Sequence, residues 1–201
     1  MEGTNPVNKK LAAALSGGAV LVLSVSLSGC SSDDGNKKLD DWAKTLCGQI
    51  QPQLAKSTKA NQQIVATAAD GKPADIQKAD AAAFQDLSDA DKAIAAALTK
   101  AGAPPVDNGA TLQQNAVKEL NTASAAYAAL VKQVKALDTG DQQKFADGLA
   151  KVSDGLDAIN KSGSGAVEKL QQGDVGKALA KQPGCKVPTS SASPSASATK
   201  S

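Results

Sequence analysis

The composition of this 201-residue chain excludes several classes of function before any motif is considered. It contains no His, all of its basic residues are Lys, and its net charge of +2 gives no broad field of one sign that would attract nucleic acid. Without His, a Ser-His-Asp triad, a Cys-His pair and the imidazole ligands of zinc are excluded. Aromatic residues make up 2% of the chain, so stacking platforms for bases, haem or sugars are scarce.

The first residues of the chain have the character of an export signal. Lys9 and Lys10 precede an apolar run that carries no charge from Leu11 to Gly29. A positive flank, an apolar run and small residues at its end are typical of a secretory signal peptide. The length of the run would also suit an uncleaved helix that spans a bilayer. The residues at its end decide between these two interpretations.

Those residues are Leu27-Ser28-Gly29-Cys30, which resemble the lipobox of bacterial lipoproteins: a Leu three positions before the Cys, then two small residues. The resemblance implies that residues 1–29 are removed as a signal peptide. It also implies that the Cys30 thiol is diacylated, with fatty acids such as palmitate, and that Cys30 becomes the new N-terminus. An ordinary signal peptide or signal anchor with a chance cysteine is the alternative. We therefore predict a secreted protein that is lipid-anchored on the extracytoplasmic face of the cell membrane.

The other cysteines sharpen this interpretation. Three cysteines are an odd number for an exported chain. If Cys30 carries lipid, Cys47 and Cys185 remain as one pair, and disulfides persist in an oxidising compartment. We therefore predict a Cys47–Cys185 disulfide, which leaves no free thiol for nucleophilic catalysis.

The mature chain begins with a segment that has little to bury. Residues 30–38 are predicted to form the lipidated Cys and a polar tether to a helical domain at 39–187. That domain opens with apolar residues three and four positions apart from Leu39 to Ala68, which is helical spacing. Pro52 falls inside this series and predicts a bend, because proline removes a backbone hydrogen bond. The apolar phase continues across the proline, so one bent helix is expected rather than two.

Three further long helices and a short one are predicted from the same spacing. Their ends are marked by residues that start or stop helices, namely Pro or Asp at the start and Gly or Pro after the last turn. The second helix is expected from near Pro73 to Gly102 and the third from about Ala110 to Leu137. The fourth is expected from after Asp141; Gly163 and Gly165 weaken it, but helical spacing continues through Val167 and Leu170. The short helix is expected from Gly173 toward Cys185. No segment has the alternating pattern of a strand.

The cysteines also constrain the arrangement of these helices. Cys47 is expected near the start of the first helix and Cys185 just past the last, so a bridge places both ends of the domain at one pole. An even number of long antiparallel helices satisfies this condition. The predicted fold is all-α: an up-down antiparallel four-helix bundle with a short extra C-terminal helix, closed by one disulfide. Residues 188–201 are predicted to be a disordered Ser/Ala/Pro tail.

Two groups of acidic residues are candidates for metal binding. Asp86, Asp89 and Asp91 lack the loop glycine and terminal Glu of an EF-hand and fall on a helix, so we interpret them as a solvated face. Glu119 and Glu168 lie on the third and fourth predicted helical stretches, but carboxylate-bridged bundles use several Glu and Glu-x-x-His pairs. The chain has neither, so we predict no metal and no cofactor.

Three other features are weak signals for function. Ser57 and Lys59 are two residues apart on a predicted helix and do not face each other, which argues against a Ser-Lys dyad. The glycines at Gly163 and Gly165 are not followed by the Gly-Lys-Ser/Thr pattern of a phosphate loop. Trp42 is expected to shield the disulfide end of the core rather than to bind a ligand.

The lipobox, an early Trp and Cys, Ala- and Lys-rich helices, a late Cys and a Ser/Ala/Pro tail together resemble small secreted lipoproteins of actinobacteria, a group largely without assigned activity. The resemblance implies a location and a fold but no reaction. We expect a non-enzymatic binding or interaction module that presents helix surfaces to a protein or cell-wall partner. The alternative is a carrier of a small apolar ligand in an interhelical cavity. Ala-rich stripes and few aromatics predict little interior volume, which argues against a large cavity.

Overall fold

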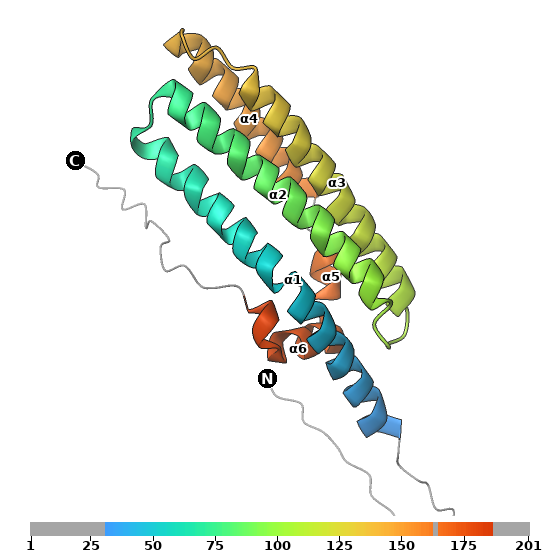
Figure 1. Cartoon of the computed structure of the whole chain (residues 1–201). Helices are drawn as coiled ribbons and strands as arrows, with labels where there is room; N and C mark the ends of the chain where they lie inside the picture. The colour runs from blue at the N-terminus through green and yellow to red at the C-terminus, as the bar shows by residue number, and fades with distance from the viewer. Residues whose placement is uncertain (1–30, 163–164, 187–201) are drawn as a thin grey trace, which may run out of the picture. The chain divides into compact units, whose positions relative to one another are not determined.

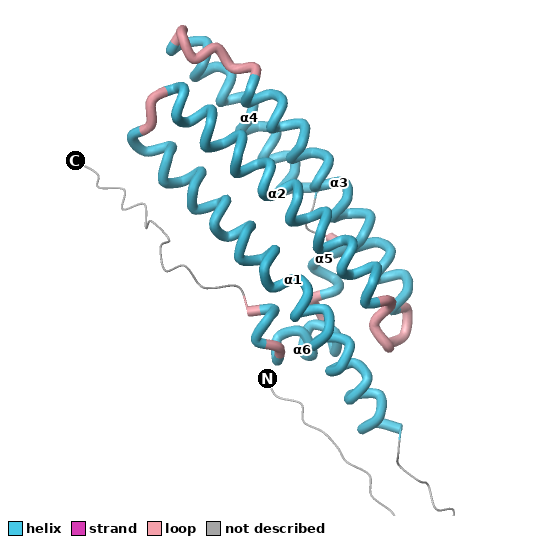
Figure 2. Tube along the Cα trace, in the orientation of Figure 1, coloured by secondary structure: helices cyan, strands magenta, loops and turns pink. Residues whose placement is uncertain are grey.

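The computed structural model describes residues 31–162 and 165–186, and every regular element in these ranges is a helix. The predicted all-α class is therefore confirmed for this part of the chain. The elements are α1 (Ser31–Asp70), α2 (Pro73–Ala101), α3 (Gly109–Lys135), α4 (Gln142–Ser162), α5 (Ala166–Leu170), α6 (Gly173–Lys181) and the 3-10 helix η1 (Pro183–Cys185) (Figure 1 and Figure 2). None of these helices combines the length and the apolar character that a membrane span requires.

Several predictions fall outside the described residues. They are the signal peptide at 1–29, lipidation of Cys30 and the tail at 188–201, all of which stay predictions. The chain divides into two units between Cys30 and Ser31. The buried core residues and both cysteines of the disulfide lie after this division. The chain from Ser31 onward therefore carries its own core and can fold by itself.

The ends of α2 and α4 lie where local sequence signals place them. Pro73 follows the N-cap residue Lys72, and Gly102 caps the other end of α2 with a positive φ of 75°. At the start of α4, the Asp141 carboxylate accepts a hydrogen bond from the Lys144 backbone N–H at 3.0 Å. Asp141 is thus the N-cap that its position predicts, because a side-chain oxygen satisfies a free N–H group of the first turn.

Helix α1 differs from the expectation at its N-terminal end. It begins at Ser31, so the predicted tether at 31–38 is helical, and serines and aspartates at the start suit the positive end of a helix. The helix continues through Pro52 to Asp70, as predicted. Cys47 therefore lies about 24 Å from the start of α1, at 1.5 Å per residue, rather than near its first turn.

The long helices pack in the order α1, α2, α3, with α2 in the middle (Figure 1). Helices α4 and α5 pack on α3, whereas α6 and η1 pack on α1. Helix α4 has 21 residues against 40 in α1. The chain therefore returns to the disulfide through α5, α6 and η1, and not through a fourth helix as long as the others.

Glycines allow α4 to lie close to α3. A Cβ atom at Gly155 would lie 2.7 Å from Leu130 Cδ2, and one at Gly148 would meet Leu137. Larger residues at these positions would require the two leucine side chains to move. Leu130 of α3 and Leu137, which follows α3, thus occupy the space that the missing side chains of α4 leave.

The core has two clusters of buried residues. The Phe84 cluster draws on α1 to α4, and its central ring stacks on Tyr127 with centroids 6.3 Å apart. Its buried members are Ala60, Ala81, Ala83, Phe84, Leu87, Leu130, Val131, Val134, Val152 and Ile159. The disulfide cluster draws on α1, α2, α3, α5 and α6. Its buried members are Leu39, Trp42, Ala43, Leu46, Cys47, Ile50, Leu98, Ala116, Leu170, Val175, Ala178 and Leu179.

A reciprocal pair of hydrogen bonds joins α2 to α3. Ser88 Oγ donates to the Ser124 carbonyl oxygen at 2.8 Å, and Ser124 Oγ donates to the Ser88 carbonyl oxygen at 2.8 Å. Both serines are buried. Their small side chains allow close approach of the two helices, and each buried hydroxyl has the partner that burial requires.

Candidate functional site

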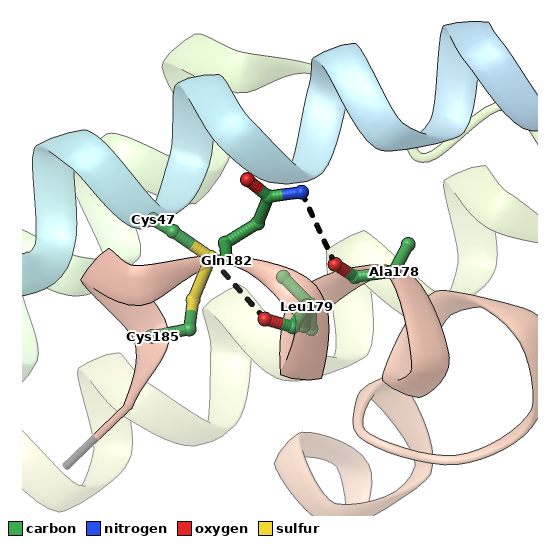
Figure 3. Close-up of a disulfide and its surroundings, with 5 residues drawn as sticks. All are labelled: Cys47, Ala178, Leu179, Gln182 and Cys185. Carbon is green, nitrogen blue, oxygen red and sulfur yellow. Dashed lines mark hydrogen bonds between the residues drawn. A yellow bond between two sulfur atoms is a disulfide. The ribbon is translucent and has the colours of Figure 1, made fainter.

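The disulfide links the middle of α1 to the end of the described chain. Cys47 and Cys185 are bonded, with their Cα atoms 4.9 Å apart, which confirms the predicted pairing. Figure 3 shows the bridge beside Leu179, whose carbonyl oxygen lies 4.0 Å from Cys47 Sγ. In the same view Gln182 Nε2 donates to the Ala178 carbonyl oxygen at 3.4 Å. The bridge therefore holds α6 and η1 against α1.

A glycine next to the disulfide sets the distance between η1 and α1. A Cβ atom at Gly184 would lie 2.6 Å from the Cys47 carbonyl oxygen, which is too close for a side chain. The backbone of η1 can therefore contact the backbone of α1 only with glycine at this position.

Beside the disulfide, a cavity of about 520 Å³ lies between the long helices and the short ones. This volume is within the usual range of small-molecule sites, roughly 300 to 1,000 Å³. Its wall is mainly aliphatic and includes Leu46, Ile50, Leu54, Ile94, Leu98, Ala116, Leu120, Val167, Leu170 and Leu179. The expectation of little interior volume is therefore wrong at this end of the fold. The cavity lies where the short helices α5 and α6 face α1, α2 and α3.

Three polar residues interrupt this wall, namely Ser57, Asp91 and Gln171. Asp91 makes no hydrogen bond or ion pair with another described residue, and no Lys lines the cavity. Burial raises the pKa of Asp91 from 3.8 to about 6, because the charged form loses solvation. At neutral pH the cavity thus contains a mostly ionised carboxylate without a cationic partner.

A smaller cavity of about 280 Å³ adjoins the first and shares Asp91, Leu120 and Val167 with it. It adds polar groups from Glu119, Tyr127 and Asn160. Burial, and then the charge of Asp91, raise the pKa of Tyr127. The two cavities therefore meet at Asp91.

Glu119 uses one of its two carboxylate oxygens to hold α5. Its Oε2 accepts a hydrogen bond from the Ala166 backbone N–H at 2.6 Å. Its Oε1 is buried and has no hydrogen-bond partner among the described residues. Glu119 thus combines a structural contact with an oxygen that lacks a donor, and unsatisfied buried acceptors are uncommon in folded proteins.

The structure separates the three aspartates that the sequence groups together. Asp86 pairs with Lys56 at 3.4 Å and Asp89 accepts a hydrogen bond from Gln85 at 3.0 Å, both near solvent. These two fit the expected solvated helix face, but the expectation is wrong for Asp91. Residues two apart on a helix point in nearly opposite directions, so Asp89 and Asp91 cannot share a face.

The spacing of residues along the second helix already indicates that Asp91 faces the interior. Leu87, Ile94 and Leu98 form an apolar stripe, and Asp91 lies four residues after the first and three before the second. A carboxylate on an apolar stripe indicates a group that faces other helices. Glu119 has a similar position, since Ala116 and Ala123 flank it on α3.

The remaining candidates have separate positions. Glu168 is exposed and accepts a hydrogen bond from Gln172 at 3.5 Å, and within the described ranges no three acidic, His or Cys side chains are arranged to hold a metal ion. Ser57 lines the cavity, whereas Lys59 is exposed. Trp42 is buried in the disulfide cluster, and its Nε1 donates to the Gly102 carbonyl oxygen at 2.9 Å.

Comparisons with known proteins give no match: no family model, no curated protein and no solved structure is similar to this chain. The function must therefore be inferred from the chemistry of the cavity. Its aliphatic wall can exclude water and bury an apolar molecule, and its few polar groups can orient that molecule.

Proposed function

We propose that this protein is a lipid-anchored protein of the cell envelope that carries a small apolar ligand between its helices and performs no catalysis. The cavity of about 520 Å³ is the observation on which the proposal depends. Each Å² of apolar surface that moves from water into such a cavity contributes roughly 25 cal/mol. An aliphatic wall of this size therefore favours an aliphatic ligand.

The surface of the domain supports this proposal over an interaction through helix faces. Val65, 70% exposed, is the large hydrophobic residue that stands out on the described surface. Exposed pairs such as Lys177 with Asp174, at 2.9 Å, contribute little to binding or stability because solvent screens them. A protein or cell-wall partner that docks on these faces would gain less than a ligand inside the cavity.

The absence of catalysis is part of the proposal. The chain has no His, and the two described cysteines are joined in the disulfide. Ser57, on the cavity wall, has no imidazole to accept its proton, and Asp91 and Glu119 lack a nearby nucleophilic thiol. Polar groups of this kind suit binding and orientation better than bond cleavage.

We also infer that α1 to α4 run antiparallel as an up-down bundle. The connections between them are short: residues 71–72, 102–108 and 136–141. Helices that are joined by such short connections and pack against each other usually lie antiparallel. The disulfide then closes the bundle at the end that contains the cavity.

The anchor has its own test. Replacing Cys30 by Ser should abolish incorporation of labelled palmitate and release the protein from the membrane fraction, because the thiol is the expected acylation site. Replacing Cys47 by Ser is the matched control and should leave both measurements unchanged. Unchanged labelling of the Cys30→Ser variant would contradict the lipoprotein hypothesis.

Ligand binding is tested with the fluorescent probe N-phenylnaphthylamine, which brightens in apolar surroundings. The chain from Ser31 onward, with its disulfide formed, should bind the probe at one saturable site. Ala116→Leu adds side-chain volume inside the cavity and should weaken binding about tenfold, whereas Ala125→Leu adds the same volume on the exposed face of α3. Equal binding by both variants, with unchanged melting, would show that the probe does not enter the cavity.

A further inference from the structure

The chemistry of the two cavities restricts the ligand further, on the basis of the carrier function proposed above. We infer that the ligand is a single-chain aliphatic amine, with its chain in the larger cavity and its ammonium group against the Asp91 carboxylate. The inference rests on charge complementarity, on the position of Asp91 and on the buried oxygen of Glu119.

The charges around the cavities favour a cation. Asp91 and Glu119 are the ionisable carboxylates in the two walls, and neither cavity is lined by Lys. Asp91 has no hydrogen bond or ion pair with another described residue, and Glu119 Oε1 has no donor. A ligand carboxylate or phosphate would add a like charge to this site, whereas an ammonium group would supply up to three N–H donors.

The position of Asp91 determines how such a ligand would lie. Because both cavities include Asp91, a head group at this residue leaves the chain free to extend along Leu46, Ile50 and Leu98. The smaller cavity also borders Asp91 and has Glu119 and Asn160 in its wall. A polar substituent next to the amine would find hydrogen-bond partners there. The arrangement therefore separates a site for the chain from a site for the head.

The expected preference for an amine over an alcohol depends on the charged hydrogen bond between the ammonium group and the Asp91 carboxylate. Hydrogen bonds to charged groups are stronger than those between neutral groups, and the gain is larger where water is partly excluded. An amine should therefore bind about tenfold or more tightly than an alcohol of the same chain length. A fatty acid should bind more weakly than the alcohol, because its carboxylate is repelled by Asp91.

The test compares dodecylamine, dodecanol and dodecanoic acid as competitors of N-phenylnaphthylamine on the chain from Ser31 onward, at neutral pH and below their micelle concentrations. We expect the order amine, alcohol, acid. Asp91→Asn keeps the size of the side chain and removes its charge, so the preference for the amine over the alcohol should fall about tenfold. Asp89→Asn removes an exposed charge from the same helix and should leave the preference unchanged.

The possible results of this test distinguish a failure of the inferred head group from a failure of the proposed carrier function. If none of the three competitors displaces the probe, the carrier function itself is wrong. If all three displace it equally, or if Asp91→Asn keeps the full preference for the amine, the cavity binds apolar chains but the inferred head group is wrong. Melting curves show whether the variant folds, and Asp91→Ser replaces Asp91→Asn if it does not.

Discussion

The Phe84 cluster and the disulfide cluster share α1, α2 and α3 but are completed in different ways. Helix α4 completes the Phe84 cluster and approaches α3 through glycines such as Gly155. The short helices α5 and α6 complete the disulfide cluster, and a cavity of about 520 Å³ remains beside it. The comparison indicates that the half held by the disulfide contains the larger cavity, whereas the smaller one borders the Phe84 cluster at Tyr127 and Ile159.

The largest expected effect is the loss of the disulfide. A Cys47→Ala/Cys185→Ala double variant should lose about 4 kcal/mol of unfolding free energy, because the bridge closes a loop with a sequence separation of 138. It should also lose probe binding, since α6 and η1 would no longer be held against α1. Urea unfolding measures the first effect. A loss below about 1 kcal/mol would show that packing alone holds this end together.

A pair of leucine truncations compares the two clusters directly. Leu87→Ala, in the Phe84 cluster at 4% exposure, should cost about 3 kcal/mol, because it leaves a void among close-packed residues. Leu120→Ala, in the wall of both cavities, should cost only about 1 kcal/mol, because its side chain already borders empty space. Urea unfolding of both variants under the same conditions tests this, and equal losses would remove the distinction between the clusters.

The next-largest expected change in stability comes from disturbing the contact between η1 and α1. Gly184→Ala should cost about 2 kcal/mol, because the new Cβ would meet the Cys47 carbonyl oxygen. Gly48→Ala is the control on α1: a Cβ there meets nothing within 4 Å, and helical Ala is favoured over Gly by about 1 kcal/mol. Thermal melting should therefore move in opposite directions for the two variants. A stabilised Gly184→Ala variant would contradict the described approach of η1.

The smallest effect is a pH dependence at Asp91. Burial raises its pKa from 3.8 to about 6, so the native state holds this proton more tightly than the unfolded chain. The stability that Asp91 contributes is therefore full below about pH 3.8 and is lost as the pH rises through 6. Asp91→Asn should be more stable than the parent by about 1 kcal/mol at pH 8, a value that allows for solvent screening.

The difference between Asp91→Asn and the parent should shrink as the pH falls to 4. Glu119 and Tyr127 are the other titratable groups that line the smaller cavity with Asp91. Both residues are present in both proteins, so the difference between the two proteins reports on the carboxyl group of Asp91. Guanidinium unfolding at pH 4, 6 and 8 measures the difference. A constant difference across this range would show that Asp91 has an ordinary pKa.

Local signals predict most of the helices but not the cavity. Pro73, Gly102 and Asp141 mark helix ends through short-range backbone chemistry, and the structure follows them. The pairing of Cys47 with Cys185 follows from the number of cysteines in the chain. The expected position of Cys47 near the start of the first helix is wrong, because that helix begins at Ser31.

The cavity depends on which helices meet at the disulfide, and this is a property of the tertiary arrangement. Ala-rich stripes and few aromatics predict little interior volume, whereas the structure has a cavity beside the short helices α5 and α6. The helical spacing of Asp91 relative to Leu87 and Ile94 predicts that it lies on the inner face of its helix. The same spacing does not predict that Asp91 lacks a cationic partner. That property depends on side chains from other helices.

Native mass spectrometry of the protein purified under mild conditions from the cells that make it tests the central claim most directly. The account predicts a population with one additional small molecule per chain, which is released on denaturation and contains an aliphatic chain. Ala116→Leu, prepared in the same way, should lack it, whereas Ala125→Leu should retain it. Recovery of the parent protein without any such molecule, together with a failure to bind added dodecylamine or dodecanol, would contradict the claim that this domain is a carrier.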